Sequence, residues 1–197
     1  MKRIILIFVA LLVFSLPLLS QTKTNLDLIY NLIDRSVLKA ESIIKNKNIT
    51  YSFLYKSPDS FSFLKSNVIS SYVRNGISIK DSDFSADKLE HIIKNIRVDY
   101  SNPFKDGFFG DLLMERTIYL EADLVLSDRT EIKTYDLNVA HKDTIEVDSI
   151  NKIENPEISF TRAPMPELPI FSNLLEPIIV VGTLIVTIIL FFTVRSK

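Results

Sequence analysis

The chain of 197 residues contains no cysteine, no tryptophan and only four glycines. The absence of cysteine excludes a disulfide scaffold, a thiol nucleophile and a thiolate metal site. Three of the glycines fall in the middle of the chain, which leaves little room for a loop that cradles phosphate. The sequence also has no Gly-x-Ser-x-Gly or His-Glu-x-x-His motif.

Acidic residues are missing from both ends of the chain. All 24 lie between Asp27 and Glu176, whereas five of the 23 basic residues lie outside that interval. The interval therefore holds 18 basic and 24 acidic residues, a net charge of −6. A nucleic-acid-binding protein needs a basic face, so this balance argues against nucleic acid as a partner.

The N-terminal end has the pattern of a secretory signal peptide over residues 1–20. Lys2 and Arg3 precede the apolar stretch 4–19, and Ser20 is a small residue at the expected cleavage position. The alternative is an uncleaved signal anchor, but 16 apolar residues are short for a span of ~20.

The C-terminal end predicts a transmembrane helix over residues 174–194. Residues 178–194 carry no charge, and the basic ending 195–197 should stay in the cytoplasm. The predicted membrane anchor residues are Ile178, Val186, Phe191, Phe192, Arg195 and Lys197. Before this helix, residues 154–173 contain four prolines, which favours an extended tether; a loop folded back on the domain is the equal alternative.

Residues 21–153 form the predicted extracytoplasmic domain, and its first half alternates between two periodicities. Apolar residues at helical spacing predict helices over 25–47, 60–75 and from Ser85 through Ile93, with Asn25, Ser60 and Ser85 as caps. Runs rich in β-formers predict strands over 49–55, 77–79 and 96–100.

The second half changes to a β pattern. After a loop over 101–111, apolar residues at alternate positions predict a long strand over 114–127 with one wet face. Further strands are predicted over 132–140 and 144–147, with a turn at Lys142-Asp143. The fold class is therefore α/β (or α+β): a small sheet with helices on one face, ending in an antiparallel meander, plus one C-terminal transmembrane helix.

The order of these elements over about residues 25–147 resembles small bacterial periplasmic α/β domains of the FlgO, CsgG and TolB N-terminal kind. The resemblance implies a place in an envelope, secretion or surface-appendage assembly. It rests on element order and transfers no functional residue, and this chain lacks the lipid-anchor cysteine that many of those proteins carry.

Three groups of residues are candidates for chemistry or binding. Asp83, Asp87 and His91 would share one face of the third helix and resemble a metal site, but a solvated face is the favoured explanation, and Asp83 precedes the expected cap Ser85. Glu121 and Asp123 would form a carboxylate pair on the long strand, and His141 should be exposed in a turn. Phe104, Phe108 and Phe109 would form a contact for a partner, or else cover the sheet edge.

The sequence thus predicts a single-pass protein of the bacterial inner membrane with its domain in the periplasm. We expect a non-enzymatic binding or assembly module without a cofactor or metal, whose partners are other envelope or membrane proteins and the lipid bilayer. Two alternatives remain: a structural subunit that contacts a membrane complex through its helix, and a metal-dependent hydrolase using Asp87, His91 or Glu121.

Overall fold

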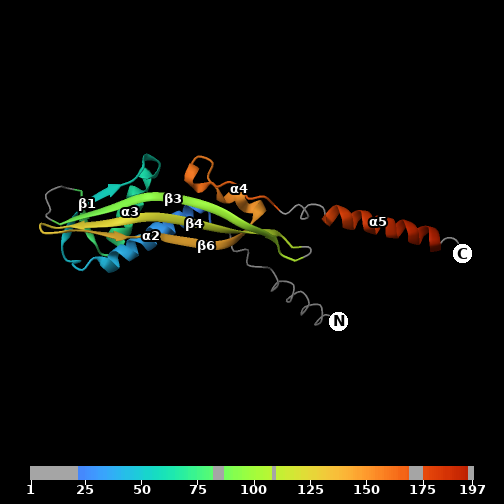
Figure 1. Cartoon of the computed structure of the whole chain (residues 1–197), viewed down its shortest axis with the longest axis horizontal. Helices are drawn as coiled ribbons and strands as arrows, with labels where there is room; N and C mark the ends of the chain where they lie inside the picture. The colour runs from blue at the N-terminus through green and yellow to red at the C-terminus, as the bar shows by residue number, and fades with distance from the viewer. Residues whose placement is uncertain (1–21, 82–86, 108–109, 169–174, 195–197) are drawn as a thin grey trace, which may run out of the picture.

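The computed structural model describes residues 22–81, 87–107, 110–168 and 175–194 (Figure 1). Helix α2 (Asn25–Ile43) leads into strand β1 (Thr50–Lys56). The 3₁₀ turn η1 (Asp59–Leu64) and helix α3 (Lys65–Arg74) come next, before the short strand β2 (Ser78–Lys80). The mixed α/β fold that the sequence predicts is confirmed.

The rest of the domain is mostly sheet. Strands β3 (Lys88–Lys105) and β4 (Leu112–Ser127) form a long antiparallel hairpin, followed by β5 (Ile132–Asp136) and β6 (Val139–Glu146). The strand order is β2-β1-β3-β4-β5, and β6 also pairs with β4. The contacts of β1 with β2 and β3 are parallel, and all contacts of β4 are antiparallel.

Helices α2 and α3 cover the same face of the sheet, as predicted (Figure 1). Along β4 the side chains at even positions are buried from Met114 to Leu124, and the odd ones are half-exposed. The buried stripe of α2 packs on this face. The stripe consists of Leu28, Ile29, Leu32, Ile33, Val37 and Ala40. The alternation predicted for the long strand is therefore confirmed, including which face is wet.

The N-terminus of α2 differs from the prediction by one residue. Thr24, not Asn25, is the cap: its hydroxyl accepts a hydrogen bond from the Asp27 N–H at 3.1 Å, and the Asp27 carboxylate accepts one from the Thr24 N–H at 3.3 Å. This reciprocal pair satisfies two amide groups that the first turn of a helix leaves free. Asn25 is thereby released for a buried role described below.

The predicted third helix is wrong. Residues from Lys88 onward belong to β3, and Ser85 lies outside the described residues. Leu89, Ile92 and Ile93 fit a helical spacing, but β1 and β4 flank β3 on both sides and satisfy its backbone hydrogen bonds as a strand. The buried face of this part of β3 is Leu89, His91 and Ile93, at alternate positions.

The turn predicted at Lys142-Asp143 is also wrong, because both residues lie within β6. The chain returns along β4 as β5 and then β6, and the interruption falls at residues 137–138 instead. Asp143 is tolerated in the strand because Arg116 faces it directly across the β4–β6 pair. The segments predicted as a meander after residue 114 therefore form one hairpin: β4 is its first strand, and β5 and β6 together are its interrupted return strand.

The described part of the proline-rich segment lies against the domain. After α4 (Ile150–Ile153), the 3₁₀ turn η3 (Ser159–Thr161) buries Thr161 completely and packs Phe160 on Phe61 with 4.9 Å between ring centroids. Ala163 and Leu168 also pack on the core. The folded-back alternative therefore holds for residues 154–168, and 169–173 are outside the described residues.

Helix α5 (Leu175–Val194) follows at the C-terminal end and extends away from the sheet (Figure 1). Within the parts of the chain that the structure describes, no helix is both long enough and apolar enough to span a membrane. The transmembrane helix predicted over residues 174–194 is therefore not confirmed.

Candidate functional site

The predicted partner contact is only partly within the described residues. Phe104 lies near the end of β3 with 44% of its surface exposed, whereas Phe108 and Phe109 are outside the described residues. The strand is irregular just before it, between Ser101 and Phe104, where Asn102 adopts a φ of +49°. The exposed Phe104 ring therefore lies just after an irregularity of β3, near the end of the β3–β4 hairpin.

His91 lies in the core rather than on an exposed helix face. Its side chain is fully buried, and its Nδ1 shares a hydrogen bond of 3.0 Å with the hydroxyl of Tyr72 on α3. Burial lowers the pKa of His91 from 6.5 to about 4 and raises that of Tyr72. Its Nε2 has no hydrogen-bond partner among the described residues.

The predicted metal group does not assemble in the described structure. His91 is enclosed on the helix side of the sheet, Asp87 directly precedes β3, and Asp83 lies outside the described residues. No three His, Asp or Glu side chains in the described ranges are placed to hold a metal ion.

The remaining candidates lie along β4 and β6. Glu121 and Asp123 share the wet face of β4, and Asp123 forms an ion pair with Lys94 of β3 at 2.8 Å. His141 lies within β6, not in a turn, with its Nε2 3.4 Å from a carboxylate oxygen of Asp143. Exposed pairs of this kind contribute little stability and are typical of a solvated sheet face.

Sequence reasoning missed a buried polar cluster centred on Arg116. The guanidinium is fully buried on the core face of β4 and bonds both carboxylate oxygens of Asp143, at 2.9 and 2.5 Å. It also donates to the side-chain oxygen of Asn25 at 2.8 Å and to the carbonyl of Lys23 at 2.9 Å. The Asn25 amide then donates to the Tyr100 hydroxyl and to the Thr161 carbonyl.

This cluster joins both ends of the domain to its sheet. Lys23 and Asn25 belong to its N-terminal end, and Thr161 belongs to the folded-back segment. Burial alone would raise the pKa of Asp143, but the hydrogen bonds and charge of Arg116 outweigh it and lower that pKa. The available sequence signal was a charged residue at an even position of a strand whose other even positions are apolar.

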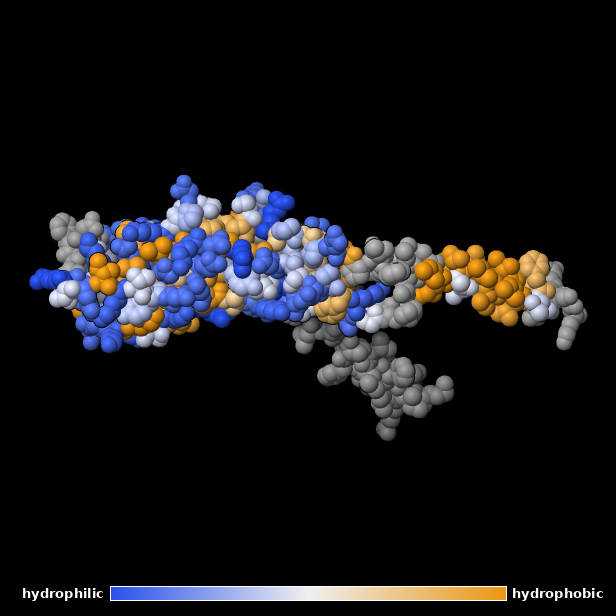
Figure 2. All heavy atoms as spheres, in the orientation of Figure 1, coloured by the Kyte–Doolittle hydropathy of each residue, from blue (hydrophilic) through white to orange (hydrophobic). Residues whose placement is uncertain are grey.

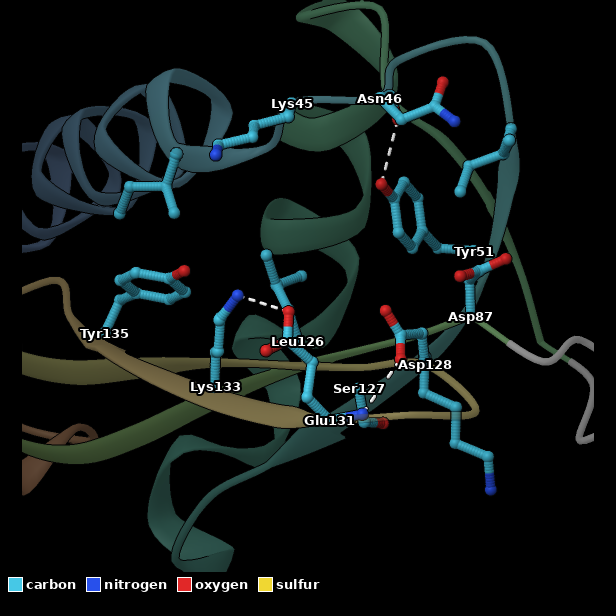
Figure 3. A pocket seen from close by; sticks show the side chains of 13 residues that line it. Lys45, Asn46, Tyr51, Asp87, Leu126, Ser127, Asp128, Glu131, Lys133 and Tyr135 are labelled. Atoms are coloured by element: carbon cyan, nitrogen blue, oxygen red, sulfur yellow. Dashed lines mark hydrogen bonds and ion pairs between the residues drawn. The ribbon is translucent and has the colours of Figure 1, made fainter.

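An open pocket of about 360 Å³ is lined in part by the β4–β5 turn (Figure 3). That turn lies at the end of the sheet opposite to α5 (Figure 1). The segment after α2, the start of β1, the start of β3 and the β4–β5 turn enclose the pocket. Lysines, acids and two tyrosines line most of its surface, notably Lys45, Lys133, Tyr135, Tyr51, Asp87 and Asp128.

Several of these polar groups are held in place by neighbours. The Tyr51 hydroxyl donates to the Asn46 carbonyl at 2.9 Å, and burial followed by the nearby charge of Asp87 raises its pKa. Lys133 pairs with Glu131, and that hydrogen bond raises the pKa of the lysine. The pocket is therefore polar and ordered at its rim, unlike the apolar clefts that hold most drug-sized ligands.

Helix α5 carries the largest exposed apolar surface among the described residues (Figure 2). The predicted anchor residues Ile178, Val186, Phe191 and Phe192 are 66%, 56%, 59% and 70% exposed. Arg195 and Lys197 lie outside the described residues.

No protein-family model and no curated protein matches this chain. The solved structures that are similar in part include two lipoproteins. Rare lipoprotein B from Shewanella oneidensis is 13% identical with a TM-score of 0.35, over 50% of this chain and 69% of that one. A minor lipoprotein from Acinetobacter baumannii is 15% identical with a TM-score of 0.30, over 52% and 76% of the two chains. Similarity at this level carries no argument about function, and it does not confirm the resemblance to FlgO, CsgG and TolB domains.

Proposed function

We propose that this protein is a non-enzymatic accessory binding protein of the bacterial cell envelope. Its apolar segment 174–194 attaches it to the inner membrane, and its α/β domain lies on the periplasmic side, where it binds other envelope proteins. The observation that carries this proposal is the exposed apolar surface of α5, on which eleven large side chains between Ile178 and Phe192 are 47–70% exposed.

An apolar surface of this kind is unfavourable in water. Soluble monomers rarely expose a contiguous apolar patch larger than a few hundred Å², so a helix that is apolar all round needs lipid or an apolar partner to cover it. Among the described residues, no side chain of α5 belongs to the core of the domain or packs against it. The basic residues at both ends of the chain support a cytoplasmic location for the C-terminus.

Membrane attachment can be tested by fractionating cells that produce the full chain. We expect the protein in the membrane fraction after an alkaline carbonate wash, and a variant ending at residue 173 in the soluble periplasmic fraction. A reporter fused after Lys197 should be active only in the cytoplasm. Release of the full chain by carbonate, or a reporter active in the periplasm, would contradict the proposed attachment.

The proposed protein contact is the end of the β3–β4 hairpin. Phe104 supports it because a large aromatic ring that is 44% exposed is a typical anchor of a protein interface. Replacing Phe104, Phe108 and Phe109 with serine should abolish co-purification of partners from native membrane in mild detergent. The matched control is Phe63→Ser, an equally exposed ring elsewhere on the domain. Equal loss of partners in both variants would argue against the hairpin.

The exposed surface of α5 also favours a second function, that of a structural subunit whose helix itself contacts a membrane complex. Replacing residues 174–194 with an unrelated transmembrane helix separates the two. Partner recovery should survive the exchange if the domain binds, and it should be lost if the helix does.

A further inference from the structure

The open pocket at the end of the sheet has its charges arranged by sign. Lys45 and Lys133 lie on one side together with the hydroxyl of Tyr135, and Glu131 pairs with Lys133 there (Figure 3). Asp87 and Asp128 lie on the other side near Tyr51 (Figure 3), and Lys88 follows Asp87 at the start of β3. Three lysines and three acids line the pocket, so its net charge is zero although its two sides differ. A pocket of this kind favours a dipolar ligand over one with a net charge of either sign.

The basic side has donors that are available to a ligand. Lys45 comes from the segment after α2 and makes no ion pair with any described residue, and its ammonium group points into the pocket (Figure 3). Tyr135 presents its hydroxyl from β5, beside Lys133. Because Lys133 already pairs with Glu131, a ligand anion would rely mainly on Lys45 and Tyr135 and would share Lys133.

The acidic side is built around the turn between β4 and β5. One carboxylate oxygen of Asp128 accepts hydrogen bonds from the Thr130 N–H and hydroxyl, both at 2.7 Å, and from the Glu131 N–H at 3.0 Å. These bonds fix the carboxylate in position while leaving its second oxygen toward the pocket. Asp87 adds a second negative charge on this side.

We propose that this pocket binds a small zwitterion, with its carboxylate or phosphate group against Lys45 and Tyr135 and its ammonium group against Asp128 and Asp87. A volume of about 360 Å³ accommodates a short peptide or a phosphoethanolamine group. The inference concerns the pocket alone and holds whether or not the chain is attached to a membrane.

The first test compares probes that differ by a single charge. Binding of triglycine, N-acetyl-triglycine, triglycine amide and the phosphodiester glycerophosphoethanolamine to the full chain in a neutral detergent would be measured by isothermal titration calorimetry. We expect triglycine to bind with a millimolar or lower Kd, and both singly charged peptides to bind at least fivefold more weakly. Tighter binding of glycerophosphoethanolamine than of triglycine would identify the anionic group as phosphate, and the reverse order would identify a peptide carboxylate.

The second test assigns the two charges to the two sides of the pocket. Lys45→Gln should weaken triglycine at least fivefold and leave triglycine amide unchanged, since that probe has no carboxylate. Asp128→Asn should weaken triglycine and leave N-acetyl-triglycine unchanged, and asparagine retains the oxygen that caps the turn. The matched control is Lys47→Gln, an exposed lysine that pairs with Glu41 and does not line the pocket.

Three results would overturn the proposal. The first is no binding of triglycine or glycerophosphoethanolamine at 10 mM, roughly the weak limit of specific small-ligand recognition. The second is equal binding of the zwitterionic and singly charged peptides. The third is an effect of Lys45→Gln no larger than that of Lys47→Gln, with unchanged circular dichroism in both variants.

Discussion

The fully buried His91 predicts that this domain loses stability in mild acid. The imidazole lies between β3 and α3, with Tyr72 on one ring nitrogen and no described partner on the other. A second proton would place a charge in an apolar core, so the folded state requires the neutral ring. The perturbation to test is therefore a change of pH, together with replacement of the titrating side chain.

The sign follows from the lowered pKa of His91. Burial takes that pKa from 6.5 to about 4, so between these values the unfolded chain binds a proton that the folded chain does not. The unfolding free energy therefore has its full value, as far as His91 is concerned, above about pH 6.5. It decreases as the pH falls from there toward 4. At about 1.4 kcal/mol per pKa unit, the full loss is about 3 kcal/mol, of which about 2 kcal/mol falls between pH 7 and pH 5.

Urea unfolding of a fragment of residues 22–168 between pH 7 and pH 5 measures this loss, because most carboxylates stay ionised in that range. The double variant His91→Leu with Tyr72→Phe removes both partners of the buried hydrogen bond and should flatten the dependence of the unfolding free energy on pH. His141→Gln, which removes the other histidine, should keep it. A wild-type fragment whose unfolding free energy is constant over this range, or an unchanged slope in the double variant, would refute the reasoning.

Three further changes test the packing described above. Leu120→Asp should lower the unfolding free energy by at least about 3 kcal/mol in urea titrations, because it places a charge on the fully buried face of β4; a neutral result would mean that the strand faces the other way. Arg116→Met should cost about 3 kcal/mol by leaving Asn25 and Asp143 without their donor, and a double-mutant cycle with Asp143→Asn should show coupling of about 1 kcal/mol or more. Gly76→Ala should lower the thermal midpoint, costing about 1 kcal/mol, because Gly76 ends α3 with a φ of +77°; an unchanged midpoint would show that the turn can adjust.

Elements with a long, regular pattern were the most predictable. The apolar stripe of α2 and the apolar–polar alternation of β4 extend over many residues. In α2 the helical spacing of three and four residues clearly fits better than the strand spacing of two, and in β4 the reverse holds. Gly76 marked the end of α3 correctly because few other residues adopt a positive φ there.

The candidate sites were less predictable because they depend on which strands are neighbours. Three apolar residues near His91 fit a helix as well as a strand, and only the flanking β1 and β4 decide between them. Arg116 and Asp143 are 27 residues apart, and the ion pair exists because β6 returns along β4 in one particular register. The pocket likewise combines residues from positions 43 to 135, which no local motif connects.

The sequence by itself determined the properties that depend only on composition or on the local spacing of apolar side chains. These are the absence of cysteine chemistry, the net negative charge of the middle of the chain, the two apolar ends and the mixed α/β domain. These follow from composition and from side-chain spacing, which need no knowledge of distant contacts. Only the tertiary structure decided that His91 is buried, that Arg116 joins both ends of the domain to the sheet, and that residues 154–168 pack on the domain. The physical reason is that burial and charge pairing depend on which segments lie side by side, and strand pairing sets that over separations of tens of residues.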